Sequence, residues 1–181
     1  MATIGKTAHQ LQKHEKLLTP SAVPVLDLQT WLPEFAGEKR SEVEVFGMTL
    51  EVDAPTASLL ILTDPAILRQ ILENLLENAL KYATSGETIA LSAREEGEAW
   101  RIVVADRGPG VDKAFQARMF ERFTRADESL EQSQGGLGIG LSIAREMAHR
   151  IGAKLSYEDR PGGGSLFILQ STDEETSPFN R

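Results

Sequence analysis

Three glycine clusters limit what this 181-residue chain can fold into. They are DRGPG at 106–110, GGLGIGLSIA at 135–144 and GGGSLF at 162–167. A single glycine-rich loop says little, because glycine also serves ordinary turns. Here the clusters are spaced around one helical segment, ENLLENALKYA at 73–83, whose polar residues share a face. Three such loops around one such helix indicate a nucleotide pocket.

Composition excludes several other classes of protein. Charged residues make up 25% of the chain and hydrophobic residues 41%, as in ordinary globular domains. The sequence has no apolar run near the roughly 20 residues that span a bilayer, no signal-peptide pattern, and no cysteine for a disulfide or thiolate metal site. The formal net charge of −8 disfavours nonspecific binding to DNA or anionic membranes. A polyanionic ligand would need positive charge concentrated locally.

The periodic segments predict alternating helices and strands, with several strands joined as hairpins. Asp27 and Asp64 are predicted helix N-caps, and Pro65 strengthens the second one. Predicted helices cover 28–40, 65–82, about 115–123 and 139–150, and predicted strands cover 42–52, 58–64, 87–93, 99–105, 153–158 and 165–171. This order favours an α+β two-layer sandwich, in which about three helices cover one face of a mixed, mainly antiparallel sheet of about five strands.

Asn74, Asn78 and Lys81 fall at i, i+4 and i+7 on one face of the predicted helix at 65–82. Taken alone, such a row is more often a solvated surface. The adjacent glycine loops reverse that weighting, because Mg²⁺ prefers a few protein oxygens combined with phosphate oxygens and water. The cluster at 135–144 is no P-loop, since no Gly-Lys-Ser/Thr follows it. It opens a helix, whose N–H groups are expected to face phosphates.

In this order the motifs resemble the catalytic, ATP-binding domain of sensor histidine kinases, within the superfamily that includes gyrase, Hsp90 and MutL. The resemblance covers about residues 25–171 and implies the Bergerat fold, with ATP and Mg²⁺ as cofactors. It implies phosphoryl transfer to a histidine of a dimerisation domain, and then to the receiver domain of a response regulator. Residues 1–24 would be the end of a dimerisation helix plus a linker, and 172–181 a disordered tail. The domain is expected in the cytoplasm, without direct contact to membrane or nucleic acid, while its parent protein can be anchored in the inner membrane.

The resemblance also assigns roles to individual residues. Asn78 matches the magnesium-binding asparagine, Lys81 a phosphate contact, and Asp106 the aspartate that accepts a hydrogen bond from the adenine amine. Tyr82 would lie against the nucleotide, and Arg125 matches the commoner position of an arginine near the triphosphate. The other expected nucleotide contacts are Gly108, Gly110, Arg122, Gly136, Leu137, Gly138, Ile139, Gly140, Leu141 and Ser165.

Asn74 favours a kinase over a hydrolase within this superfamily. Hydrolases usually carry glutamate four residues before the magnesium asparagine, where the carboxylate activates water. Asn74 cannot take a proton, whereas a neutral histidine acceptor is already a nucleophile at pH 7. The expected catalytic group is therefore Asn74, Asn78, Lys81 and Arg125. A conformational ATPase of the gyrase or chaperone type and a non-catalytic nucleotide-binding module are the alternatives.

Residues 112–136 are expected to form a lid over the nucleotide. Phe120 and Phe123 match the family's hydrophobic lid anchors, and Arg122 and Arg125 flank the second anchor. Surface solvation is the rival interpretation for each arginine.

The phosphoacceptor histidine is not expected in this chain. HEKLLTP at 14–20 resembles the acceptor motif, but Leu17 and Leu18 stand where a basic residue and its neighbour belong. Too few residues separate His14 from Asn78 to hold the rest of a dimerisation hairpin and the first strands of the ATP domain.

Overall fold

In the computed structural model, the described residues are 23–82, 88–122, 124 and 139–172. The helices are α2 (Leu28–Val45), α3 (Pro65–Tyr82), α4 (Lys113–Gln116) and α5 (Gly140–Arg150). The strands are β1 (Val25–Asp27), β2 (Thr49–Asp53), β3 (Leu60–Leu62), β4 (Thr88–Glu96), β5 (Ala99–Ala105), β6 (Ala153–Asp159) and β7 (Ser165–Ser171).

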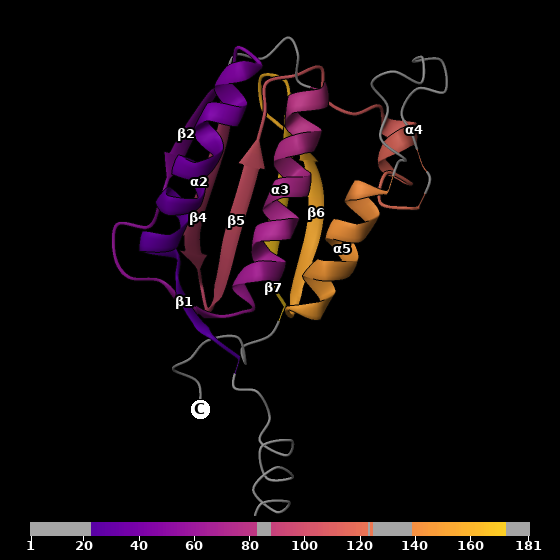
Figure 1. The fold of residues 1–181 in the computed structure, drawn as a ribbon. Coiled ribbons are helices and arrows are strands. Elements are labelled where there is room, and N and C mark those ends of the chain that lie inside the picture. Colours follow the sequence, from indigo (N-terminus) through magenta and orange to yellow (C-terminus); the bar gives the residue numbers. More distant parts are fainter. Residues whose placement is uncertain (1–22, 83–87, 123, 125–138, 173–181) are drawn as a thin grey trace, which may run out of the picture.

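Five of these strands form one sheet in the order β2-β4-β5-β7-β6. β2 and β4 are parallel, and the other neighbouring pairs are antiparallel. Helices α2, α3 and α5 lie on one face of the sheet (Figure 1). The predicted two-layer α+β sandwich with a mixed sheet is therefore confirmed. A two-stranded ribbon of β1 and β3, which the sequence patterns did not indicate as a separate sheet, lies at the lower end in Figure 1.

The prediction of one strand over 42–52 is wrong. Helix α2 continues to Val45, and β2 begins only at Thr49. Val43 is 1% exposed and Val45 is 84% exposed. Their alternation with glutamates imitated a strand, because over so short a stretch helical and strand periods are hard to tell apart. Gly47, with φ +71°, then turns the chain from helix into strand, in a conformation that glycine adopts without strain.

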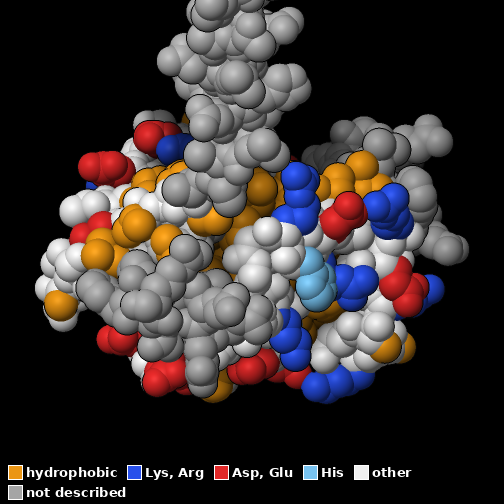
Figure 2. Space-filling model, turned by 90° about the horizontal axis from the view of Figure 1, so that it is seen from below, with side chains coloured by type: hydrophobic (Ala, Val, Ile, Leu, Met, Phe, Trp, Pro, Cys, Tyr) orange, Lys and Arg blue, Asp and Glu red, His pale blue; other side chains and the backbone are white. Residues whose placement is uncertain are grey.

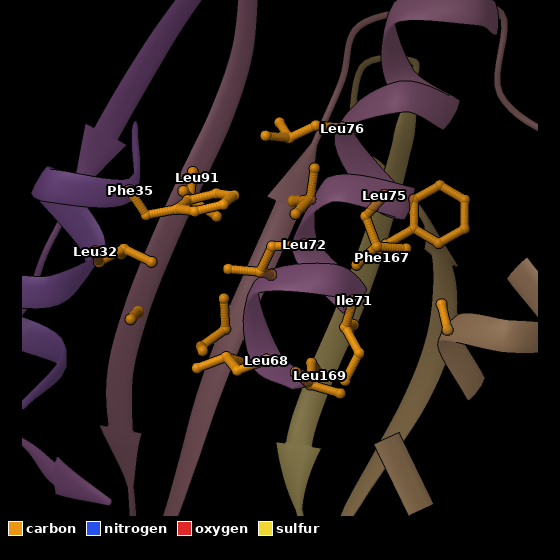
Figure 3. Packing of buried hydrophobic residues seen from close by; sticks show 14 of the residues in the cluster. Leu32, Phe35, Leu68, Ile71, Leu72, Leu75, Leu76, Leu91, Phe167 and Leu169 are labelled. Carbon is orange, nitrogen blue, oxygen red and sulfur yellow. The ribbon is translucent and has the colours of Figure 1, made fainter. Parts of the chain in front are cut away.

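The core lies between the helices and the sheet. The buried residues of α3 are Leu68, Ile71, Leu72, Leu75, Leu76, Ala79 and Leu80. Figure 3 shows them meeting Phe35 of α2, Leu91 of β4 and Phe167 of β7. Each fully buried leucine or isoleucine contributes about 1.5–3 kcal/mol. The predicted apolar stripe of α3 is therefore confirmed, and its burial fixes the direction in which the opposite face of the helix points.

Both predicted N-caps are present. Asp64 Oδ1 accepts hydrogen bonds from the N–H groups of Ala66 (2.9 Å) and Ile67 (3.3 Å) at the start of α3. Asp27 Oδ1 accepts from the N–H of Gln29 (3.0 Å) and so caps α2. Among the described helices, none combines the length and apolar character needed to cross a membrane.

Asp27 also joins segments that are distant in sequence. Its Oδ1 accepts a bond from the Leu59 N–H (3.0 Å), and its Oδ2 accepts one from the Ser58 hydroxyl (2.7 Å). The carboxylate therefore ties the start of α2 to the residues that lead into β3.

Asp27→Ala is expected to lower the free energy of unfolding by about 2 kcal/mol at pH 7, since a helix cap and two further hydrogen bonds are lost. Bonds from Ser58, then from the N–H groups of Gln29 and Leu59, lower the pKa of Asp27. Its contribution is thus complete above the unfolded-state pKa of about 3.9 and disappears as pH falls through the lower folded-state pKa. Urea unfolding at descending pH measures this. Asp53→Ala, at an exposed carboxylate on β2, is the control, and equal losses at pH 7 would contradict the prediction.

Candidate functional site

Helices α3 and α5 pack side by side and run in opposite directions (Figure 1). Asn74 is half-buried on α3. A Cβ placed on Gly140, the first residue of α5, would stand 3.6 Å from Asn74 Oδ1. Asn78 lies one helical turn, about 5–6 Å, further along α3 and therefore beyond the first residue of α5. The structure thus brings both asparagines to the start of α5.

The N-terminus of α5 lacks a side-chain cap. Its N-cap residue is Ile139, whose apolar side chain accepts no hydrogen bond. The Ile139 carbonyl accepts bonds from the Ser142 hydroxyl (2.8 Å) and the Ile143 N–H (2.9 Å). Leu141 is half-buried against the core. The first N–H groups of α5 are the donors of this helix that an anion would meet first. The predicted contacts at Gly136, Leu137 and Gly138 lie outside the described residues.

Asp106 lies in a turn at the carboxyl end of β5 and is 5% exposed. Its Oδ1 accepts bonds from the N–H groups of Gly108 (2.8 Å) and Ser165 (3.3 Å). Its backbone N–H donates to the Ser165 carbonyl oxygen (3.0 Å). Three predicted residues are therefore in direct contact. Both of these carboxylate bonds end on Oδ1, which leaves Oδ2 as the oxygen on which a ligand can act.

Arg160 is a residue of this turn that the sequence patterns missed. Its Nη1 donates to the Asp106 carbonyl oxygen (3.0 Å), and its own N–H donates to the Gly164 carbonyl oxygen (3.0 Å). The signal available in the sequence was the position of Arg160 directly before Pro161 and the last glycine cluster.

Lys81 and Tyr82 end α3. Lys81 Nζ lies 4.9 Å from the centroid of the Tyr82 ring, and Tyr82 is 42% exposed. A cation–π contact at an exposed site is worth about 0.5–1 kcal/mol. The ammonium group is therefore held weakly and can move to an anionic ligand at small cost.

Glu73, next to Asn74 in sequence, faces a different helix. Its Oε1 lies 2.8 Å from Lys39 Nζ of α2, and this bond raises the pKa of Lys39. The only side chain at this level of α3 that faces α5 is therefore the neutral amide of Asn74, among the two. Within the described residues, no group of three or more His, Cys, Asp or Glu side chains could hold a metal ion.

The structure does not bring Arg122 to the other predicted residues. Arg122 Nη2 pairs with Glu146 Oε2 of α5 at 2.7 Å, nearly two turns along the helix from Gly140. The two side chains are 67% and 61% exposed, and such exposed pairs contribute less than about 1 kcal/mol. Phe120 is half-buried against the core, and the Arg145 guanidinium lies 5.5 Å from its ring centroid. Phe123 and Arg125 lie outside the described residues.

An open hollow of about 750 Å³ lies beside α5, away from Asn74 and Asp106. Its lining includes Arg122, Arg145, Glu146 and Lys154. Charges of both signs meet there, and the hollow shares only Arg122 with the predicted contacts. The end opposite the glycine turns likewise shows basic and acidic side chains interspersed around apolar ones (Figure 2). We therefore take the asparagines, the start of α5 and the Asp106 turn as the candidate site. These parts share the upper end of the molecule in Figure 1.

Gly164 and Gly163 differ in one respect. Both have a positive φ, +108° and +105°, but a Cβ on Gly164 would collide with the carbonyl oxygen of Asp106, whereas nothing lies within 4 Å of a Cβ on Gly163. Gly163→Ala is expected to cost only about 1–2 kcal/mol of conformational strain. Gly164→Ala is expected to cost at least 2 kcal/mol more and to displace the Asp106 turn. Urea unfolding of both variants measures the difference, and similar losses would show that the turn tolerates the extra atom.

Comparisons with known proteins agree with this site. Residues 63–175 match the family described as histidine kinase-, DNA gyrase B- and HSP90-like ATPases. The sensor-like histidine kinase SenX3 of Mycolicibacterium smegmatis is 32% identical over 160 residues, which is 88% of this chain and 41% of SenX3. The sensor histidine kinase YkoH of Bacillus subtilis is 35% identical over 130 residues, or 72% of this chain and 28% of YkoH.

Solved structures give the same result. Full-length ShkA in complex with AMPPNP superposes with a TM-score of 0.69 at 26% identity, covering 92% of this chain and 36% of ShkA. The catalytic domain of histidine kinase ThkA superposes with a TM-score of 0.71 at 21% identity, covering 85% of this chain and 98% of that domain, which supports the fold. The chain spans less than half the length of SenX3 and YkoH. It belongs to the family of histidine kinase-, DNA gyrase B- and HSP90-like ATPases, on the side of the sensor histidine kinases.

Proposed function

We propose that this chain is the ATP-binding catalytic domain of a two-component sensor histidine kinase. It transfers the γ-phosphoryl group of ATP to a histidine on a dimerisation domain, for relay to the receiver domain of a response regulator. The observation that carries the proposal is the position of Asn74 and Asn78 at the uncapped start of α5, at the same end of the fold as the buried carboxylate of Asp106.

The Asp106 turn is the proposed adenine site. Oδ1 is engaged by the N–H groups of Gly108 and Ser165, so Oδ2 is the oxygen that accepts the bond from the exocyclic amine of adenine. Guanine carries a carbonyl acceptor at that position and would meet the carboxylate with repulsion. The positive φ of Gly110, +75°, lets the backbone turn beside the base.

The start of α5 is the proposed phosphate site. Its N–H groups and helix dipole, with residues 136–141, favour negative charge there. Lys81 and Arg125 add positive charge, and Tyr82 lies against the nucleotide. Mg²⁺, when bound, neutralises charge on the phosphate oxygens. Asn78 fits such an ion, because its amide supplies one neutral oxygen while phosphates and water supply the remainder.

The chemistry needs positioning and charge neutralisation from the protein rather than a general base. A neutral imidazole nitrogen attacks the γ-phosphorus, an N–P bond forms, and the bond from phosphorus to the β,γ-bridging oxygen breaks to release ADP. Asn74 offers no carboxylate to activate water, which disfavours the conformational ATPase. The positive groups offset charge on the transferring phosphoryl group. Residues 112–136 act as the lid, and Arg122 joins the site only if it leaves Glu146.

Asp106→Asn tests the base site. Asparagine keeps an oxygen for Gly108 and Ser165 but presents an NH₂ donor to the adenine amine. ATP affinity measured by isothermal titration is expected to fall about 10- to 100-fold, the range for a hydrogen bond to a charged group. Because the new donor suits guanine, the preference for ATP over GTP should narrow. An unchanged ATP:GTP ratio would show that Asp106 does not read the base.

Phosphotransfer is tested with γ-labelled ATP, this chain and a histidine-bearing dimerisation hairpin from a sensor kinase. We expect acid-labile, base-stable label on the hairpin, and no label with Asn78→Ala. Rapid phosphate release in the absence of a hairpin would instead support the conformational ATPase. Binding of ATP with neither reaction would support the non-catalytic module.

A further inference from the structure

Four side-chain and backbone groups form a closed ring of hydrogen bonds beside the Asp106 turn. The Val111 N–H donates to Tyr157 Oη (3.1 Å), and the Tyr157 hydroxyl donates to Asp159 Oδ1 (3.0 Å). Gln116 Nε2 donates both to Asp159 Oδ1 (2.8 Å) and to the Val111 carbonyl oxygen (2.8 Å). Both backbone polar groups of Val111 are therefore held by side chains, at a point where the chain has no regular secondary structure.

The ring is anchored to the rigid part of the fold. Tyr157 lies on β6, and its aromatic ring packs edge-to-face on Phe167 of β7, with centroids 5.5 Å apart and an interplanar angle of 67°. Phe167 is 1% exposed. The hydroxyl group therefore stands at a fixed place at the end of the sheet, and Val111 is fixed by it.

The acceptor end of the ring is charged. Lys113 Nζ lies 2.7 Å from Asp159 Oδ2, outside the ring. Lys113, and then the Tyr157 hydroxyl, lower the pKa of Asp159, while burial raises the pKa of Tyr157. At neutral pH the carboxylate therefore accepts and the hydroxyl donates.

The ring is connected to Asp106 through two glycines. Val111 follows Gly110, and a Cβ on Gly110 would stand 3.4 Å from the Gly164 carbonyl oxygen and 3.8 Å from Tyr157 Oη. Gly164 in turn abuts the carbonyl oxygen of Asp106. This packing leaves little room, so a displacement of Val111 must also displace the turn that carries the Asp106 carboxylate.

We propose that Tyr157 and Asp159 are positioning residues that hold the 106–111 turn ready for the adenine base. The inference rests on the proposed function, because it gives the ring a role in nucleotide binding. The ring holds the turn before the ligand arrives, so that binding need not order it. Since it acts at the base end, it should favour adenosine, ADP and ATP by the same factor.

The test is Tyr157→Phe in the full chain, a change that keeps the packing on Phe167 and removes only the hydroxyl group. Isothermal titration should show affinities for adenosine, ADP and ATP that are each about fivefold weaker, the factor that one net hydrogen bond is worth. In the phosphotransfer assay KM for ATP should rise by the same factor at unchanged kcat. Hydrogen exchange of the Val111 amide should become faster without nucleotide.

Two substitutions at Asp159 and one at Lys113 serve as controls. Asp159→Ala should reproduce the loss, whereas Asp159→Asn keeps an oxygen in the ring and should restore most of the affinity. Lys113→Gln removes only the exposed ion pair and should leave affinity unchanged. A Tyr157→Phe protein that binds all three ligands like the wild type overturns the inference, as does a loss much larger for ATP than for adenosine. If the wild type binds none of the three ligands, the proposed function itself fails, and the inference with it.

Discussion

The packing of α3 against the sheet is the interaction on which the candidate site depends. Seven side chains of this helix are buried between the layers, so the helix cannot rotate about its axis without exposing them. The direction of Asn74 and Asn78 is therefore set by residues on the opposite side of the helix. Helix α5, whose residues Ala144 and Ala148 are fully buried, packs beside it and brings Gly140 to Asn74.

The ends of the central strands supply the second half of the site. Asp106 follows β5 and Ser165 begins β7, and the pairing of these strands places the two residues opposite one another. A buried carboxylate is costly unless it is hydrogen-bonded, and two backbone N–H groups meet that requirement. The remaining oxygen keeps its charge and its direction. The fold thus holds a selective acceptor at the base end and N–H donors at the phosphate end.

Local signals in the sequence predicted much of this fold. The caps at Asp27 and Asp64 were predictable, because each depends on a few neighbouring residues. The strand predicted at 42–52 was wrong, since Val43 and Val45 satisfy both periods and burial of Val43 against the sheet decided between them. The pair of Arg122 with Glu146 and the ring at Tyr157 join residues that are 24 and 46 positions apart. No local pattern predicts such contacts, because they depend on how the layers pack. The roles assigned to individual site residues therefore stay predictions.

The β1–β3 ribbon and the candidate site lie at opposite ends of α3 (Figure 1). The 18 residues of this helix separate them by about 27 Å. The residues before Val25 therefore attach to the domain at the end remote from Asn78. With the core rigid, the domain behaves as a lever whose pivot is the ribbon. A rotation of about 10° at that pivot moves the phosphate end by roughly 5 Å, so small changes in the preceding segment become large displacements where a phosphoryl group would leave.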